Sequence, residues 1–177
     1  FQKRKNEVRY SIDFWKDGYI YIHTNENAED YKILRCKIKN LENLSNSIKK
    51  TLALESNIQL MAKEFLNARG SMFLGRGSSF PIALEGALKL KELSYLHAEG
   101  YPAGEMKHGP LALIEEGMPV VVIAPRDEHY LKTMSNMQEV IARGAKVLLI
   151  TNKNKDEIVS ENIWEQIEVD KLNEELI

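Results

Sequence analysis

The sequence predicts an α/β domain with three layers, α-β-α, built around a mostly parallel sheet. Short runs such as PVVVIAP and KVLLIT are apolar without alternation, which is typical of strands buried on both faces. Segments with helical periodicity separate these runs, and strands that alternate with helices predict right-handed βαβ crossovers. Together these observations favour an open parallel sheet with helices on both faces.

The predicted elements follow one another from Leu41 onwards. Apolar residues at helical spacing predict one or two helices over residues 41–69, with Gly70 as a C-terminal cap. The sequence then predicts a strand at 72–74, a helix from 81 to about 98, a strand at 120–124, a helix at about 128–143 and a strand at 146–151. An edge strand at 163–169 and the start of a helix at 171–177 complete the series.

The first forty residues have a different pattern. Residues 11–23 alternate around Asp17-Gly18, a strong turn pair, and residues 31–38 form a second strand-like run. We therefore predict an extension over residues 1–40 that forms a small β meander, and an α/β domain over residues 41–177. A linker or an edge piece of a larger protein is an equally good interpretation of the extension.

Composition excludes several classes of function. The 24 Lys and Arg residues against 26 Asp and Glu give a net charge of −2, which offers no excess positive charge to bind nucleic acid. No apolar run approaches the ~18 residues that span a membrane. The single cysteine, Cys36, fits a reducing compartment, so we expect a cytoplasmic protein without a metal or a cofactor.

The loop between the first core strand and its helix, GRGSSFP, is the first candidate site. Its glycines allow a tight turn, Ser78 or Ser79 can cap the helix, and the helix N-terminus can bind a phosphate. Small residues and a cap are also what any strand-to-helix turn of this architecture needs. The candidate substrate-binding residues are Gly75, Arg76, Gly77, Ser78 and Ser79.

The next helix and the segment after it hold the candidate acid/base groups. Glu85, Lys89 and Glu92 share one helical face, which by itself is most often a solvated surface. Residues 99–110 contain turn-forming glycines and prolines and present Glu105, Lys107 and His108 from a predicted rigid loop. His108 and a helical carboxylate would supply an acid/base pair, whereas His97 is expected to be structural, at the negative end of the helix.

The segment FLGRGSSFPIALEGALKLKELSYLHAEGYPAGEMKHGPLALIEEGMPVVVIAP, residues 73–125, closely resembles the second sugar-isomerase (SIS) subdomain of glucosamine-6-phosphate synthase, the isomerising glutamine:fructose-6-phosphate amidotransferase. The resemblance extends more loosely over residues 41–169 and implies an SIS-like, flavodoxin-like fold. It implies a part in amino sugar biosynthesis, in which fructose 6-phosphate and glutamine-derived ammonia give glucosamine 6-phosphate.

The resemblance also implies roles for three residues. Glu92 corresponds to the base that moves a proton between C1 and C2 of the sugar, and Lys89 to its electrostatic partner. Burial is expected to raise the pKa of that carboxylate toward the working pH. His108 corresponds to the histidine that opens the sugar ring and is presented to the neighbouring subunit of a homodimer. The expected ligand is therefore fructose 6-phosphate or a related phosphosugar.

Several parts of the resembled enzyme are not matched. We expect the glutaminase domain, the first SIS domain with its phosphate loop, and the C-terminal tail with its imine-forming lysine to be missing, so that the isolated chain is an inactive fragment. The alternative is a non-catalytic module for sugar-phosphate binding or dimerisation. Glu92→Gln separates the two hypotheses, because it abolishes isomerase activity but leaves binding or dimerisation nearly intact.

Overall fold

The structure is a computed structural model that describes residues 10–14, 19–24, 32–152 and 163–170. The chain divides into two compact units, one that includes the residues up to Ala53 and one that spans Leu54–Asp170. The helix predicted at 171–177 lies outside the described residues. Within the described ranges, no helix is both long enough and apolar enough to cross a membrane.

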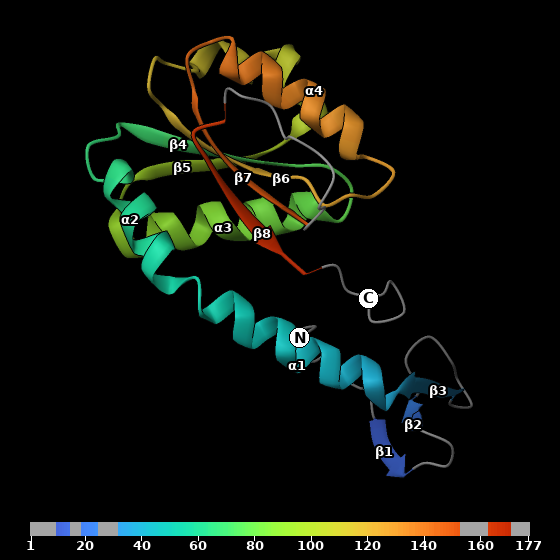
Figure 1. Cartoon of the computed structure of the whole chain (residues 1–177). Helices are drawn as coiled ribbons and strands as arrows, with labels where there is room; N and C mark the ends of the chain where they lie inside the picture. The colour runs from blue at the N-terminus through green and yellow to red at the C-terminus, as the bar shows by residue number, and fades with distance from the viewer. Residues whose placement is uncertain (1–9, 15–18, 25–31, 153–162, 171–177) are drawn as a thin grey trace. The chain divides into compact units, whose positions relative to one another are not determined.

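The N-terminal unit contains a small antiparallel sheet followed by a helix (Figure 1). Strand β1, Tyr10–Phe14, pairs with β2, Tyr19–Thr24, which pairs in turn with β3, Lys32–Lys37. This confirms the predicted β extension, although the Asp17-Gly18 turn falls outside the described residues. Helix α1, Ile38–Leu52, follows β3 and belongs to this unit. The compact N-terminal unit therefore extends beyond residue 40, to Ala53. The domain boundary after residue 40 stays a prediction.

The larger unit is built on five parallel strands in the order β5-β4-β6-β7-β8. Starting with β4 as the first strand of the unit, this is the 2-1-3-4-5 order of flavodoxin-like folds. The predicted α/β architecture with three layers is thereby confirmed. The strands are β4 Gly70–Gly75, β5 His97–Pro102, β6 Pro119–Ile123, β7 Lys146–Asn152 and β8 Glu165–Val169.

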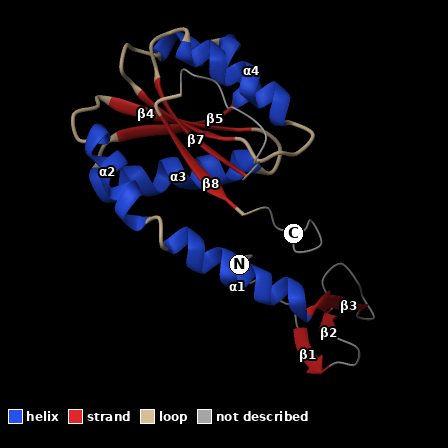
Figure 2. Cartoon of the chain, in the orientation of Figure 1, coloured by secondary structure: helices blue, strands red, loops and turns tan. Residues whose placement is uncertain are grey.

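Helices cover both faces of this sheet (Figure 2). Helices α2, Glu55–Phe65, and α3, Ser79–Ser94, lie on one face, and α4, Tyr130–Ile141, lies on the other. Two short 3₁₀ helices, η1 at Ala103–His108 and η2 at Pro110–Leu113, follow β5. Because η1 packs against α4, the two belong to the same side of the sheet.

The main core lies between the sheet and the layer of α4 and η1. Alternate residues of β6 and β7 point into it, and Val120, Val122, Val147 and Leu149 are completely buried there. From the helical layer, Met106, Met137 and Val140 are equally inaccessible. The opposite face of the sheet is less well covered, because an apolar groove of about 690 Å³ lies among α2, α3 and the strands.

Three features of the chain differ from the prediction. The helix predicted to reach residue 98 ends at Ser94, and residues 97–102 form strand β5 instead of part of a loop. Gly70 is the first residue of β4 and does not cap a helix. Gly100, taken as a turn residue, lies within β5, where an added Cβ would stand 2.9 Å from the Cα of Leu84 in α3. Close packing of a helix on the edge strand therefore accounts for this glycine.

Tyr95 offers a test of the way α3 ends. It follows the helix with φ 60°, in the left-handed region, and it is 93% exposed. Because a Cβ in this conformation costs about 1–2 kcal/mol, we expect Tyr95→Gly to raise the free energy of unfolding by up to about 1 kcal/mol in denaturant titrations. Leu93→Gly, at an exposed helical position, serves as the control and should lower it by about 1 kcal/mol. Equal destabilisation by both substitutions would contradict this account.

Candidate functional site

The acidic and basic residues predicted on α3 form an exposed ion-paired stripe. Lys89 Nζ lies 2.7 Å from Glu92 Oε2 and 3.7 Å from Glu85 Oε1. These spacings follow from helix geometry, because residues three and four apart lie on the same face. The hydrogen bond to Glu92 and the charge of that carboxylate raise the pKa of Lys89 above its ordinary value. The lysine is therefore held in its charged form beside Glu92.

The burial expected for Glu92 is not provided by the described part of this chain. Its side chain is 50% exposed, and that of Lys89 is 53% exposed. Apolar neighbours on the same helix are also uncovered, with Ile82 at 59% and Leu93 at 82% exposed. The charged stripe therefore lies in a surface with large apolar side chains.

His108 is the last residue of η1 and is close to a carboxylate that the sequence did not pair with it. Its Nδ1 lies 3.0 Å from Oε2 of Glu105, and the exposed fractions of the two side chains are 72% and 59%. The sequence placed Glu105 in the same segment, but as part of a loop. Residues three apart lie directly over one another in a 3₁₀ helix. Because the sequence predicted a loop here, Glu105 was not paired with His108.

The structure does not bring Glu92 and His108 together within one chain. Helix α3 starts after the carboxyl end of β4 and runs back, so that Glu92 lies about 20 Å along it, toward the amino ends of the strands. His108 follows the carboxyl end of β5, in η1, on the α4 side of the sheet. The predicted acid/base pair therefore lies at opposite edges and on opposite sides of the sheet.

The loop Gly75–Ser79 is held mainly by internal contacts. Arg76 turns toward α4, where its Nη2 donates to Oδ1 of Asn136 at 3.1 Å, and its buried Nε has no partner among the described residues. Ser78 occupies the N-cap position of α3 without a side-chain capping bond, which differs from the predicted cap. The backbone N–H groups of Ser79 and Phe80 donate to carbonyl groups in the loop, so they are not available to an anion. Phosphate binding here stays a prediction.

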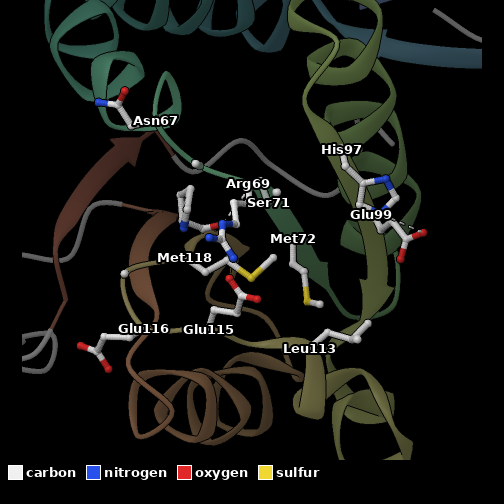
Figure 3. Close-up of a pocket in the computed structure, with 14 residues that line it drawn as sticks. Asn67, Arg69, Ser71, Met72, His97, Glu99, Leu113, Glu115, Glu116 and Met118 are labelled. Atoms are coloured by element: carbon white, nitrogen blue, oxygen red, sulfur yellow. Dashed lines mark hydrogen bonds and ion pairs between the residues drawn. The ribbon is translucent and has the colours of Figure 1, made fainter.

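A pocket of about 490 Å³ lies at the amino ends of β4, β5 and β6 (Figure 3). His97 and Glu99 of β5 line it, together with Arg69 and with Glu115 and Glu116 from the turn before β6. His97 is the first residue of β5 and does not lie at a helix end as predicted. Its Nε2 is 3.6 Å from Oε1 of Glu99. The hydroxyl of Tyr101 donates to Glu99, and this bond raises the pKa of the tyrosine.

Neither this pocket nor the apolar groove is lined by any of the predicted site residues. Open α/β sheets bind ligands at the carboxyl ends of their strands, which is the opposite edge from this pocket. Within the described ranges, no group of three or more His, Cys, Asp or Glu side chains is arranged to hold a metal ion.

The fold and these motifs agree with comparisons to known proteins. Residues 64–171 match the SIS domain family, and the chain belongs to that family. Its matched segment is homologous to the C-terminal isomerase domain of glutamine–fructose-6-phosphate aminotransferase. The isomerizing enzyme of Bartonella quintana is 52% identical over 121 residues, which cover 68% of this chain and 20% of that enzyme. The enzyme of Bradyrhizobium diazoefficiens is 59% identical over 113 residues, with coverage of 63% and 19%.

A solved structure gives the same assignment. The C-terminal domain of glucosamine-fructose-6-phosphate aminotransferase from Francisella tularensis superimposes with a TM-score of 0.72 at 44% identity, covering 78% of this chain and 39% of that one. A putative phosphosugar isomerase from Silicibacter pomeroyi follows with a TM-score of 0.56 and 31% identity, covering 77% and 41%. The chain thus spans about a fifth of the length of its curated relatives.

The contact that fastens η1 to α4 can be tested by substitution. Lys107 Nζ lies 2.9 Å from Oε1 of Glu139, whose side chain is only 22% exposed and whose Oε2 has no hydrogen-bond partner in the part of the chain that the structure describes. Lys107→Ala leaves this carboxylate without that cation, so we expect the free energy of unfolding to fall by about 1 kcal/mol. Lys132→Ala, at an exposed position of α4, is the control for denaturant unfolding. An equal effect of both substitutions would show that the ion pair contributes nothing.

Proposed function

We propose that this chain is the second sugar-isomerase subdomain of an isomerising glutamine–fructose-6-phosphate aminotransferase. The observation that carries the proposal is the stripe Glu85, Lys89 and Glu92, which lies within the segment that matches the SIS domain family and holds a lysine against a carboxylate at 2.7 Å. The phosphosugar substrate is fructose 6-phosphate.

Glu92 is the proposed base of the isomerisation. Its carboxylate accepts a proton from C1, next to the protonated imine at C2 of the opened sugar, and the electron pair of the C–H bond forms a neutral enamine. The same group then returns this proton to C2 while the C1 hydroxyl releases its proton to water and becomes the aldehyde, which completes the transfer between C1 and C2. Lys89 stabilises the carboxylate while it is charged and holds it in one orientation through their hydrogen bond.

The environment of α3 supports a site that is completed by another domain or subunit. Glu92 is half exposed, and Ile82 and Leu93 are exposed beside the stripe. A surface that combines large apolar side chains with a charged cluster is typical of an interface. Covering it would remove water from Glu92 and Lys89, which strengthens their interactions with a bound sugar.

The positions of Glu92 and His108 support a homodimeric site. Because they lie at opposite edges of one sheet, a single subdomain cannot apply both to the same sugar. In a twofold-symmetric dimer, His108 of one subunit can face the site that contains Glu92 of the other. We therefore propose that each active site combines Glu92 from one subunit with His108 from its partner.

The alternative function is a non-catalytic module that binds sugar phosphate or dimerises. The half-exposed state of Glu92 favours this alternative, because a general base gains from burial. The two functions differ in what happens when the carboxylate alone is removed.

Glu92→Gln tests the catalytic proposal in a chimaera in which residues 64–170 replace the matching segment of the Bradyrhizobium diazoefficiens enzyme. We expect kcat for glucosamine 6-phosphate formation to fall by about 10²–10⁴-fold, since the amide cannot accept the proton. Binding of fructose 6-phosphate, measured by calorimetric titration, should change little. Glu64→Gln, outside the stripe, is the matched control. Full activity of Glu92→Gln would leave only the non-catalytic alternative.

Mixing two inactive chimaeras tests the shared site. Subunits carrying Glu92→Gln are mixed with subunits carrying His108→Gln, under conditions that let the subunits exchange. One site of each mixed dimer then holds an intact Glu92 and an intact His108, so about a quarter of wild-type activity should return at equal amounts. If both residues serve a site within the same subunit, no mixed dimer has an intact site and activity stays absent.

A further inference from the structure

The segment that carries His108 is held rigidly by three contacts. Met106 of η1 is fully buried in the main core. Lys107 forms an ion pair of 2.9 Å with Glu139 of α4. At Gly104 the backbone packs against Arg76, because an added Cβ would stand 2.5 Å from its Nη2. The backbone under Glu105 and His108 is therefore fixed by its neighbours on both sides.

The 3₁₀ geometry of η1 places the Glu105 and His108 side chains together. Residues three apart lie directly over one another in such a helix, and the two groups meet at 3.0 Å between Nδ1 and Oε2. The structure describes two other histidine side chains. His97 and His129 are 3.6 and 3.7 Å from their nearest carboxylates, and they approach them through Nε2. Only His108 of these three meets a carboxylate through Nδ1 at hydrogen-bond distance.

We propose that Glu105 is a positioning residue that fixes the tautomer of His108. An ionised carboxylate has no proton to donate, so at 3.0 Å its negative oxygen favours the form of His108 in which Nδ1 carries the proton. In a neutral imidazole the other nitrogen, Nε2, is then the one with a free electron pair. Nε2 therefore becomes the proton acceptor, at the outer end of a side chain that is 72% exposed.

The catalytic meaning of this arrangement rests on the proposed function. Nε2 takes the proton of the anomeric hydroxyl of cyclic fructose 6-phosphate, and the bond between C2 and the ring oxygen breaks. The electron pair of that bond goes to the ring oxygen, which receives the proton from Nε2 as a new hydroxyl group. The imidazole returns to its starting state, and Glu105 keeps the ring in one orientation throughout.

Nitrogen NMR of the uniformly ¹⁵N-labelled chain tests the tautomer without any sugar. Spectra are recorded at about pH 8, where an ordinary imidazole is neutral. We expect His108, assigned from the spectrum of His108→Gln, to be protonated at Nδ1. Glu105→Ala should shift it toward the Nε2-protonated form, and Glu105→Gln should keep the Nδ1 form, because the amide oxygen still accepts a hydrogen bond. Glu128→Ala, beside His129, is the matched control and should leave His108 unchanged.

These results separate the inference from the proposed function. Protonation of His108 at Nε2 in the unmodified chain would overturn the inference, as would an unchanged tautomer in Glu105→Ala. In the active chimaera, Glu105→Ala should lower kcat by about tenfold or more with KM unchanged, and Glu105→Gln should recover part of it. A chimaera that lacks all activity while the Nδ1 tautomer is observed would reject the proposed function and leave the role of Glu105 intact.

Discussion

The burial of one face of the parallel sheet is the constraint on which the rest of this domain depends. Side chains from β6 and β7 alternate between the two faces, and those on the α4 face are excluded from solvent. Met106 extends the same core into η1, so the hydrophobic effect that holds the sheet to α4 also fixes the 3₁₀ turn that follows β5. The position of His108 is thus a consequence of core packing two residues away.

The other face carries a different kind of surface. Helix α3 packs closely on the sheet through small residues, with Ala83 and Ala87 buried and Gly100 of β5 against its backbone. Its outer side presents charges and uncovered apolar side chains together. A parallel sheet normally has both faces covered, yet an apolar groove remains open between α2 and α3 among the described residues. The two layers therefore differ: one is a completed core, and the other leaves apolar side chains uncovered.

The sequence predicted the strands that are buried on both faces and the edge strand β8, but it missed the other edge strand, β5. PVVVIAP and KVLLIT have no alternative to a central strand, and β6 and β7 lie within a residue or two of the predicted bounds. Strand β5, HAEGYP, is an edge strand with polar residues and a glycine, so nothing in its pattern distinguishes it from a loop. Likewise, Tyr95 gives no sequence sign of a left-handed helix end, because that position usually selects glycine.

The candidate site also has one part that the sequence predicted and one part that it did not. Helical spacing was enough to place Lys89 beside Glu92, whereas pairing Glu105 with His108 required knowledge that residues 103–108 form a 3₁₀ helix. The pair on η1 is complete within one chain, because its backbone is fixed by contacts of that chain alone. The carboxylate of Glu92 on α3 has its ionic partner, Lys89, but half of its side chain is exposed to water. The chemistry proposed for Glu92 therefore depends on coverage of α3 by another domain or subunit. The orientation and tautomer proposed for His108 depend only on the folding of this chain.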